Sequence, residues 1–311
     1  MKIVFYADNH TDMEGPKKVE GLVEELLKQH APKDLVICTE DNSDEFTKRV
    51  FAKGLKGIMS GEYYIRHIID SPVVKAAHFD LLKVFAGFAE KGVRIFPVDM
   101  NTTTAKGIDV LMLGHQYRDL EDRLGGARSF DRAFVAYADM LKLLQQGDAI
   151  RNPDIFENIS AVIAEQKPEC VVVVYGGAHI PYLKQRFDAL GYNTSVRNES
   201  VFESLDTRVD AAVARGCLTE EDRLEVARGL LLAIGTSYRT SASKNEMETA
   251  LDQKRVTKLR GLVDKVKSMD EARGVFDSMA SGEFFERLSD KAETRTQKRL
   301  RELGIPERRP R

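Results

Sequence analysis

Short apolar runs alternate with longer amphipathic segments over the N-terminal two thirds of the chain. Four runs rich in β-branched and aromatic residues have the length of buried strands, and a fifth has the mixed character of an edge strand. The runs are KIVFYA (2–7), DLVICT (34–39), VRIFPV (93–98), CVVVVY (170–175) and NTSVRN (193–198). Because helical patterns separate them, they predict an α/β fold, a mostly parallel sheet with helices on both faces.

The segments between these runs carry helical signals. Apolar residues recur at helical spacing from Pro16 to Gln29, with proline in the first-turn position. Another apolar helix is expected to end at Gly92, where glycine suits the stop position. We also expect helical insertions over about 43–90 and 104–146, and a separate helix that opens at Pro153 and runs to 166.

The pattern changes near residue 204, beyond which amphipathic helical segments follow one another without a strand-like run. Thr219 and Asp222 have the spacing of a capping pair at the start of one of these helices. We therefore predict an α/β core over 1–203, which holds both insertions, and a helical region over 204–311 with a basic tail. The amphipathic helices of 204–311 fit two roles, packing on their own core or contacting a second copy or another protein.

The composition narrows the choice of partners. With 47 basic and 49 acidic residues the net charge is −2, so no nucleic acid is expected and a small-molecule or peptide substrate is favoured. No apolar stretch has the length of a membrane span or of a signal peptide. The three cysteines lack the spacing of a zinc site and suit a reducing compartment. These features predict a cytoplasmic protein, and an effector exported by a specialised secretion system would share them.

Polar residues follow each of the four apolar runs at the point where the strand ends. The carboxyl ends of parallel strands meet at one edge of a sheet, so these side chains are expected to converge. They are Asp8 and His10 after the first run, Glu40 after the second, Asp99 after the third, and His179 after the fourth, where Gly176 and Gly177 precede it. Capping favours Ser, Thr, Asp and Asn, so it does not explain Glu or His at several such ends.

Two chemistries fit this set of side chains. Asp8, His10, Glu40 and His179 are suitable ligands for a divalent metal such as manganese, iron, cobalt or zinc. The same histidines and carboxylates also suit metal-free general acid and base catalysis. The glycines at 176 and 177 are expected to let the backbone turn sharply and approach a ligand closely.

The motifs resemble those of the superfamily that contains TraB and Tiki-like proteins, erythromycin esterase-like enzymes and ChaN-like haem-binding proteins. Its members carry two Gly-x-x-His motifs at strand ends, an acidic residue after the second strand and an Arg-Asn or Arg-Asp helix start between the motifs. The corresponding residues are Ala7-Asp8-Asn9-His10, Glu40, Asp99, Arg151-Asn152 and Gly176-Gly177-Ala178-His179. The resemblance covers roughly residues 1–198.

This resemblance implies hydrolysis in some branches, with a metal in the Tiki-like one, and ligand binding without hydrolysis in the ChaN-like one. We therefore expect a hydrolase of an ester, amide or peptide bond in which His10, His179 and Glu40 surround an activated water. Arg151 would hold a substrate carboxylate or a developing oxyanion. Asp99, Asn152, Gly176 and Gly177 would line the substrate site. The alternative is a module that binds haem or another cofactor, or acts as an effector, without hydrolysis.

The opening MKIVFYADNHTD also resembles that of a calcineurin-type metallophosphoesterase, in which a strand presents Asp-x-His to a two-metal centre. The resemblance is confined to the N-terminus, because no Gly-Asp pair follows directly on the second strand-like run and no Gly-Asn-His motif is present in the sequence. It implies a metal-dependent phosphohydrolase as a further alternative.

Overall fold

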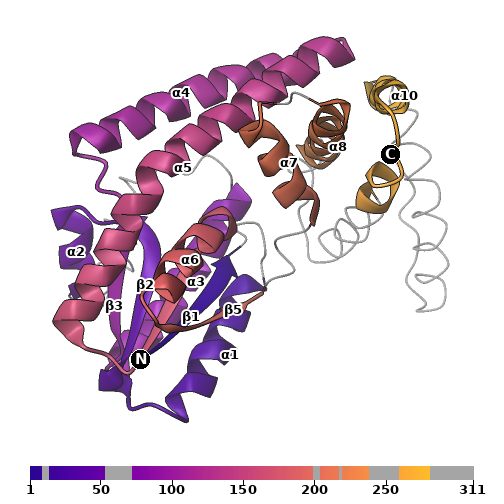
Figure 1. Cartoon of the computed structure of the whole chain (residues 1–311). Coiled ribbons are helices and arrows are strands. Elements are labelled where there is room, and N and C mark those ends of the chain that lie inside the picture. Colours follow the sequence, from indigo (N-terminus) through magenta and orange to yellow (C-terminus); the bar gives the residue numbers. More distant parts are fainter. Residues whose placement is uncertain (9–13, 53–71, 199–203, 217–218, 238–258, 281–311) are drawn as a thin grey trace, which may run out of the picture. The chain divides into compact units, whose positions relative to one another are not determined.

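The chain forms two compact units in the computed structural model (Figure 1), which describes residues 1–8, 14–52, 72–198, 204–216, 219–237 and 259–280. The sheet unit comprises Met1–Gln116 and Leu143–Glu203, and the helical unit comprises Tyr117–Lys142 and Ser204–Arg311. The sequence had assigned the whole segment 104–146 to the α/β core, whereas the structure groups Tyr117–Lys142 with the C-terminal helices. Its apolar side chains pack there, which periodicity along the chain does not reveal.

The sheet unit is built on five parallel strands, which confirms the predicted fold class. They are β1 (Lys2–Asp8), β2 (Leu35–Asn42), β3 (Arg94–Asp99), β4 (Cys170–Gly176) and β5 (Asn193–Arg197), in the order β3-β2-β4-β1-β5. All four neighbouring pairs are parallel. β4 therefore lies at the centre, buried along most of its length, and β5 lies at an edge as its polar composition predicts.

Helices cover both faces of this sheet because its strands are apolar on both sides. On one face, alternate strand residues such as Val4, Ile37 and Val172 pack against α1 (Gly15–Leu27) and α3 (Pro72–Glu90). On the other face, residues such as Phe5, Cys38 and Val173 pack against the second half of α5 (Phe130–Gln166) and against α6 (Ile180–Ala189). Both clusters consist of closely buried side chains, so each face contributes a hydrophobic core.

Short connections complete the unit. The 3-10 turns η1 (Pro32–Asp34) and η3 (Gly177–His179) lead into β2 and out of β4, and α2 (Glu45–Ala52) follows β2. Asp44 caps α2, since its Oδ1 accepts a hydrogen bond of 2.7 Å from the N–H of Thr47. After α3 the chain passes through Gly92 at φ +91°, a left-handed conformation that favours glycine, as the stop signal predicts.

The helix expected to open at Pro153 does not begin there. α4 (Ala105–Gly125) is followed by α5, which runs without a break from Phe130 to Gln166 and holds Pro153 in its interior. Proline lacks the N–H that would bond the carbonyl of Ala149, at a typical cost of about 3 kcal/mol. Burial of Ile155 and Ile159 against the sheet offsets that cost, since both are fully buried.

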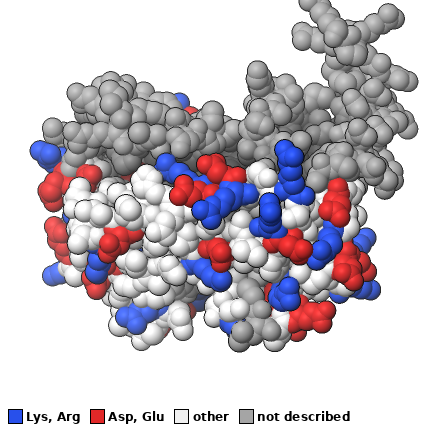
Figure 2. Space-filling model, turned by 90° about the horizontal axis from the view of Figure 1, so that it is seen from above, with Lys and Arg blue, Asp and Glu red and all other residues white. Residues whose placement is uncertain are grey.

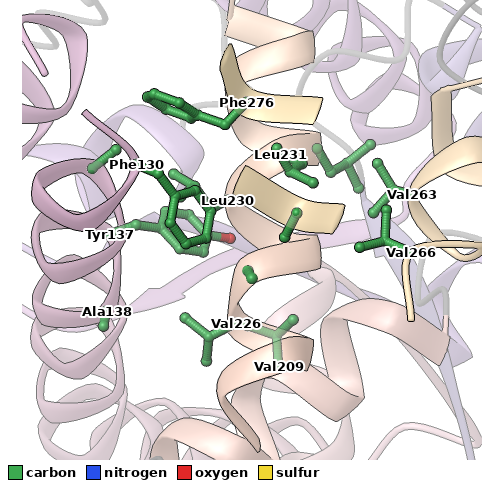
Figure 3. Packing of buried hydrophobic residues seen from close by; sticks show 14 of the residues in the cluster. Phe130, Tyr137, Ala138, Val209, Val226, Leu230, Leu231, Val263, Val266 and Phe276 are labelled. Atoms are coloured by element: carbon green, nitrogen blue, oxygen red, sulfur yellow. The ribbon is translucent and has the colours of Figure 1, made fainter. Parts of the chain in front are cut away.

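The helical unit has its own apolar core, formed by parts of the chain that are far apart in sequence. It contains α7 (Ser204–Ala214), α8 (Glu220–Ser237), the helical residues 259–263 and α10 (Met269–Ala280), together with the first part of α5. Figure 3 shows Phe130 and Tyr137 of α5 pointing toward Leu230 of α8. Thr219 and Asp222 form the predicted capping pair, because each side chain accepts a hydrogen bond from the other residue's backbone N–H.

The surface of the described residues agrees with the balanced composition. Lys and Arg side chains are interspersed with Asp and Glu on the face drawn in Figure 2, with no extended region of one sign. None of the described helices combines the length and apolarity that a bilayer crossing requires. The basic tail lies outside the described residues.

Substitution by alanine is expected to have opposite effects on stability at two glycines of α4. A Cβ on Gly107 would lie 2.5 Å from Thr102 Cα and closer still to the Asn101 carbonyl oxygen, whereas a Cβ on Gly114 would meet no atom within 4 Å. We expect Gly107→Ala to lower the free energy of unfolding by about 1–3 kcal/mol, because backbone must move. Gly114→Ala should raise it by about 0.5–1 kcal/mol. Urea denaturation measures both, and equal effects would contradict the close packing after β3.

Candidate functional site

The strand order brings the predicted polar ends together at one edge of the sheet. Asp99 ends β3, Glu40 lies at the end of β2, Gly176 ends β4 and Asp8 ends β1, and these strands are successive neighbours. The register of the β2–β3 pairing shifts between Thr39 and Asn42, so the last residues of β2, Glu40 among them, are irregularly paired. Such irregularities redirect a side chain. Asp8 pairs with Gly176, so the end of β1 lies beside the end of β4.

Arg151 of α5 lies between two of these carboxylates. Its Nη2 donates to Asp99 Oδ2 at 2.9 Å and to Glu40 Oε1 at 3.3 Å, and its Nε donates to Asp99 Oδ1 at 3.4 Å. Burial alone would lower the pKa of Arg151, but the neighbouring negative charges, led by Asp99, outweigh burial and raise it. The guanidinium charge is therefore compensated within the protein, and its Nη1 is the nitrogen with no hydrogen-bond partner among the described residues.

Gly176 makes room for Glu40. The N–H of Gly176 donates to Glu40 Oε2 at 2.5 Å, and a Cβ on Gly176 would lie 2.7 Å from that same oxygen. The φ of Gly176 is −52°, a value that any residue adopts, so space and not backbone conformation requires glycine here. The close approach predicted from the two glycines exists, but the group that approaches Gly176 is a carboxylate of the protein.

His179 faces two residues of α5, one at each ring nitrogen. Its Nδ1 lies 2.6 Å from Asn152 Oδ1, which as a carbonyl oxygen accepts, so Nδ1 carries the proton. Its Nε2 then keeps a lone pair, 3.8 Å from Asp148 Oδ1, which is too long for a direct hydrogen bond. The ring of Tyr175 packs edge-on against the imidazole at 5.2 Å between centroids. The imidazole is thus oriented with an unprotonated nitrogen toward a carboxylate.

The surroundings keep His179 neutral. Burial lowers its pKa, and the positive charge of Arg151 acts in the same direction, against the opposing charges of Glu40, Asp148 and Asp99. Burial also raises the pKa of Asp148, although His179 and Arg151 oppose that shift. Burial raises the pKa of Tyr175 well above its usual value, with Asp99 and Glu40 adding to it.

At the other end of β4, burial raises the pKa of the Cys170 thiol to about 11, which leaves it protonated at neutral pH.

A single stripe of α5 supplies three of these groups. Asp148, Arg151 and Asn152 stand at positions i, i+3 and i+4, and the same stripe continues through buried Ile155 and Ile159. It is apolar under the sheet and turns polar where the strands end. The motif resemblance identifies Arg151 and Asn152 but not Asp148, because a helix that starts at Pro153 would leave residue 148 outside it. The helical spacing of Asp148 relative to Ile155 and Ile159 is the signal in the sequence that places Asp148 on this stripe.

The described residues assemble only part of the predicted metal site. Both oxygens of Glu40 accept hydrogen bonds, and His10 lies outside the described residues. Among the residues that the structure describes, no group of three or more His, Cys, Asp or Glu side chains is arranged to hold a metal ion. The divalent metal and the haem alternative therefore stay predictions. Gly177, at the start of η3, is buried.

A cleft of about 510 Å³ lies between α4 and α5 of the sheet unit, away from these groups. Its lining residues are Asp109, Met112, Leu113, Gln146, Ala149 and Ile150. On a helix with 100° per residue, positions 146, 149 and 150 face away from 148, 151 and 152. The cleft is thus on the opposite side of α5 from His179.

The contact between Gly176 and Glu40 predicts an energetic coupling. We expect Gly176→Ala to lower the free energy of unfolding by about 1–3 kcal/mol in the native background, because the new methyl group displaces the carboxylate. In a Glu40→Ala background the cost should be smaller by at least about 1 kcal/mol. Denaturation of the four proteins of this cycle measures the difference. Gly87→Ala, where a Cβ meets nothing within 4 Å, is the matched control and should show no coupling to Glu40→Ala.

The sequence matches no family model, and neither a curated protein nor a solved structure is significantly similar to it. The resemblance to the TraB, erythromycin esterase-like and ChaN-like superfamily stays a prediction from the motifs.

Proposed function

We propose that the protein hydrolyses an ester or amide bond, peptide bonds included, with His179 as the general base. The observation that carries the proposal is the orientation of one buried imidazole. Asn152 Oδ1 accepts a hydrogen bond from the Nδ1–H, burial keeps the ring neutral, and the lone pair of Nε2 faces Asp148. A neutral histidine whose tautomer is held by a hydrogen bond is the arrangement that general base catalysis needs.

The gap between His179 Nε2 and Asp148 Oδ1 suits a water molecule. At 3.8 Å apart, the two acceptors can each receive a hydrogen bond of about 2.8 Å from one water. That water attacks the carbonyl carbon of the substrate while Nε2 takes its proton. The proton then passes to the departing oxygen or nitrogen as the carbonyl carbon releases it. Asp148 stabilises the imidazolium that exists between the two transfers.

Arg151 supports the developing oxyanion in this scheme. Its Nη1 donates to the carbonyl oxygen as negative charge accumulates there, while Nε and Nη2 stay bound to Asp99 and Glu40. The earlier expectation that Arg151 holds a substrate carboxylate fits less well, because two carboxylates of the protein already compensate its charge. Glu40 and Asp99 are positioning residues for Arg151, and Asn152 is a positioning residue for His179.

The first test replaces the base. His179→Ala should lower kcat/KM by about 10²–10⁴ on any 4-nitrophenyl ester or 4-nitroanilide that the native protein cleaves, and Asn152→Leu should lower it by tenfold or more. His30→Ala is the matched control, because His30 pairs with Glu169 before β4, at the opposite end of the strands. Circular dichroism checks folding. Undiminished activity in folded His179→Ala, or no hydrolysis by the native protein over a broad panel, would overturn the proposal.

The pH profile is a second test. His179 acts as a base only when neutral, and its pKa is lowered from the ordinary value of about 6.5. kcat/KM should therefore be constant near neutral pH and fall only as the pH drops below 6.5. In Asp148→Asn the inflection should move to still lower pH, because the charge of Asp148 raises the pKa of His179. An inflection above 6.5 in the native protein would argue against His179 as the base.

A further inference from the structure

The described charges of the candidate site are unbalanced. Glu40, Asp99 and Asp148 supply three carboxylates, and Arg151 supplies one guanidinium. Because Arg151 forms ion pairs with both Glu40 and Asp99, these two carboxylates already compensate its positive charge. His179 contributes no positive charge while it is neutral. Within the described part of the chain, an anionic ligand beside Asp148 would therefore meet net repulsion.

Asp148 is the carboxylate, among those described at this site, that forms no ion pair with Arg151. Among the described residues, the group that it approaches within 4 Å with opposite potential charge is His179 Nε2, at 3.8 Å from Oδ1. The side chain is 31% exposed, so a ligand can reach it, yet enough of it is buried to raise the pKa of the carboxyl. Partial burial that nearby positive charge compensates only in part makes an ionised carboxylate costly, and a cation that binds beside it offsets that cost.

His179 provides an independent indication of what the ligand must bring. Its side chain is only 6% exposed, and Nε2 has no hydrogen-bond partner among the described residues while it faces Asp148. With Nδ1 donating to Asn152, Nε2 is an acceptor, as are both oxygens of Asp148. Nε2 and the Asp148 oxygens, which face each other across 3.8 Å, therefore all accept hydrogen bonds. A ligand that fits them supplies hydrogen-bond donors, and an ammonium or guanidinium group supplies several donors together with the positive charge that the Asp148 carboxylate favours.

We infer that the preferred substrates carry a positively charged amine or guanidinium group near the scissile bond, and that the Asp148 carboxylate receives it. The inference rests on the proposed function and deepens it by naming the substrate class. One oxygen of Asp148 serves the water beside Nε2, and the other is available to the cation. The site thereby excludes carboxylate-bearing analogues by charge.

Three matched esters test this preference. They are the 4-nitrophenyl esters of 4-(aminomethyl)benzoic, 4-ethylbenzoic and 4-(carboxymethyl)benzoic acid, which are cationic, neutral and anionic at pH 7.5. Each kcat/KM is divided by the rate of spontaneous hydrolysis, which removes differences in reactivity. We expect the cationic ester to be preferred over the neutral one by about tenfold, and the anionic ester to be the poorest.

Asp148→Asn should reduce the ratio of the cationic to the neutral ester to about one, whatever happens to the rates themselves. Asp139→Asn is the matched control on the same helix, since Asp139 is exposed and pairs with Lys142, and the ratio should not change. A native preference for the neutral or anionic ester, or a ratio that persists in Asp148→Asn, would overturn the inference and leave the proposed hydrolysis intact.

A binding measurement separates the inference from the proposed function. Benzylamine, benzyl alcohol and phenylacetate are titrated against the native protein and Asp148→Asn, and the shift in thermal unfolding is recorded. If only benzylamine raises the unfolding temperature, and Asp148→Asn abolishes that shift, the cation site is supported. This holds even if no ester is cleaved, and the absence of cleavage would then overturn the proposed hydrolysis alone. Equal shifts with all three compounds, or no shift with benzylamine, would overturn the cation site.

Discussion

The ion pairs of Arg151 are the interaction on which the site depends. One guanidinium joins α5 to the ends of β2 and β3, and through Glu40 to the backbone of β4 at Gly176. Removing it would leave two partly buried carboxylates facing each other, a loss that typically costs about 3–5 kcal/mol. The geometry of Asn152 and His179 depends on the same helix turn. Arg151 thus serves the architecture of the edge before it serves any substrate.

The edge is also arranged so that charge and burial compete at His179. Three carboxylates would raise the pKa of a nearby imidazole, yet burial and Arg151 together lower it. The outcome follows from distance and solvation: the carboxylates that bond to Arg151 have most of their field compensated, whereas the loss of water around the ring is not compensated. A neutral histidine in an acidic environment is the result, and the chemistry we propose relies on it.

Pro153 shows how packing decides a local conflict. Read locally, proline marks a helix start, and the residue before a proline is biased away from helical geometry. The helix nevertheless continues, because Ile155 and Ile159 on one side of Pro153 and Arg151 and Asn152 on the other all have partners at the sheet. Asn158 adds to this by donating to the carbonyl of Val98 at 3.1 Å. The missing backbone hydrogen bond is outweighed by contacts that exist only in the folded unit.

The sequence by itself determined the strands, the stop at Gly92, the capping pair of Thr219 and Asp222, and the polar residues at the strand ends, because each is written in local periodicity or residue type. Glu40, Asp99 and His179 were thus identified before their contacts were known, and Arg151 and Asn152 were identified through the motif resemblance. Only the tertiary structure decided the strand order, the continuity of α5, the membership of Asp148 and the place of Tyr117–Lys142 in the helical unit. These depend on which groups meet through space, and burial and charge compensation have no local signature along a chain.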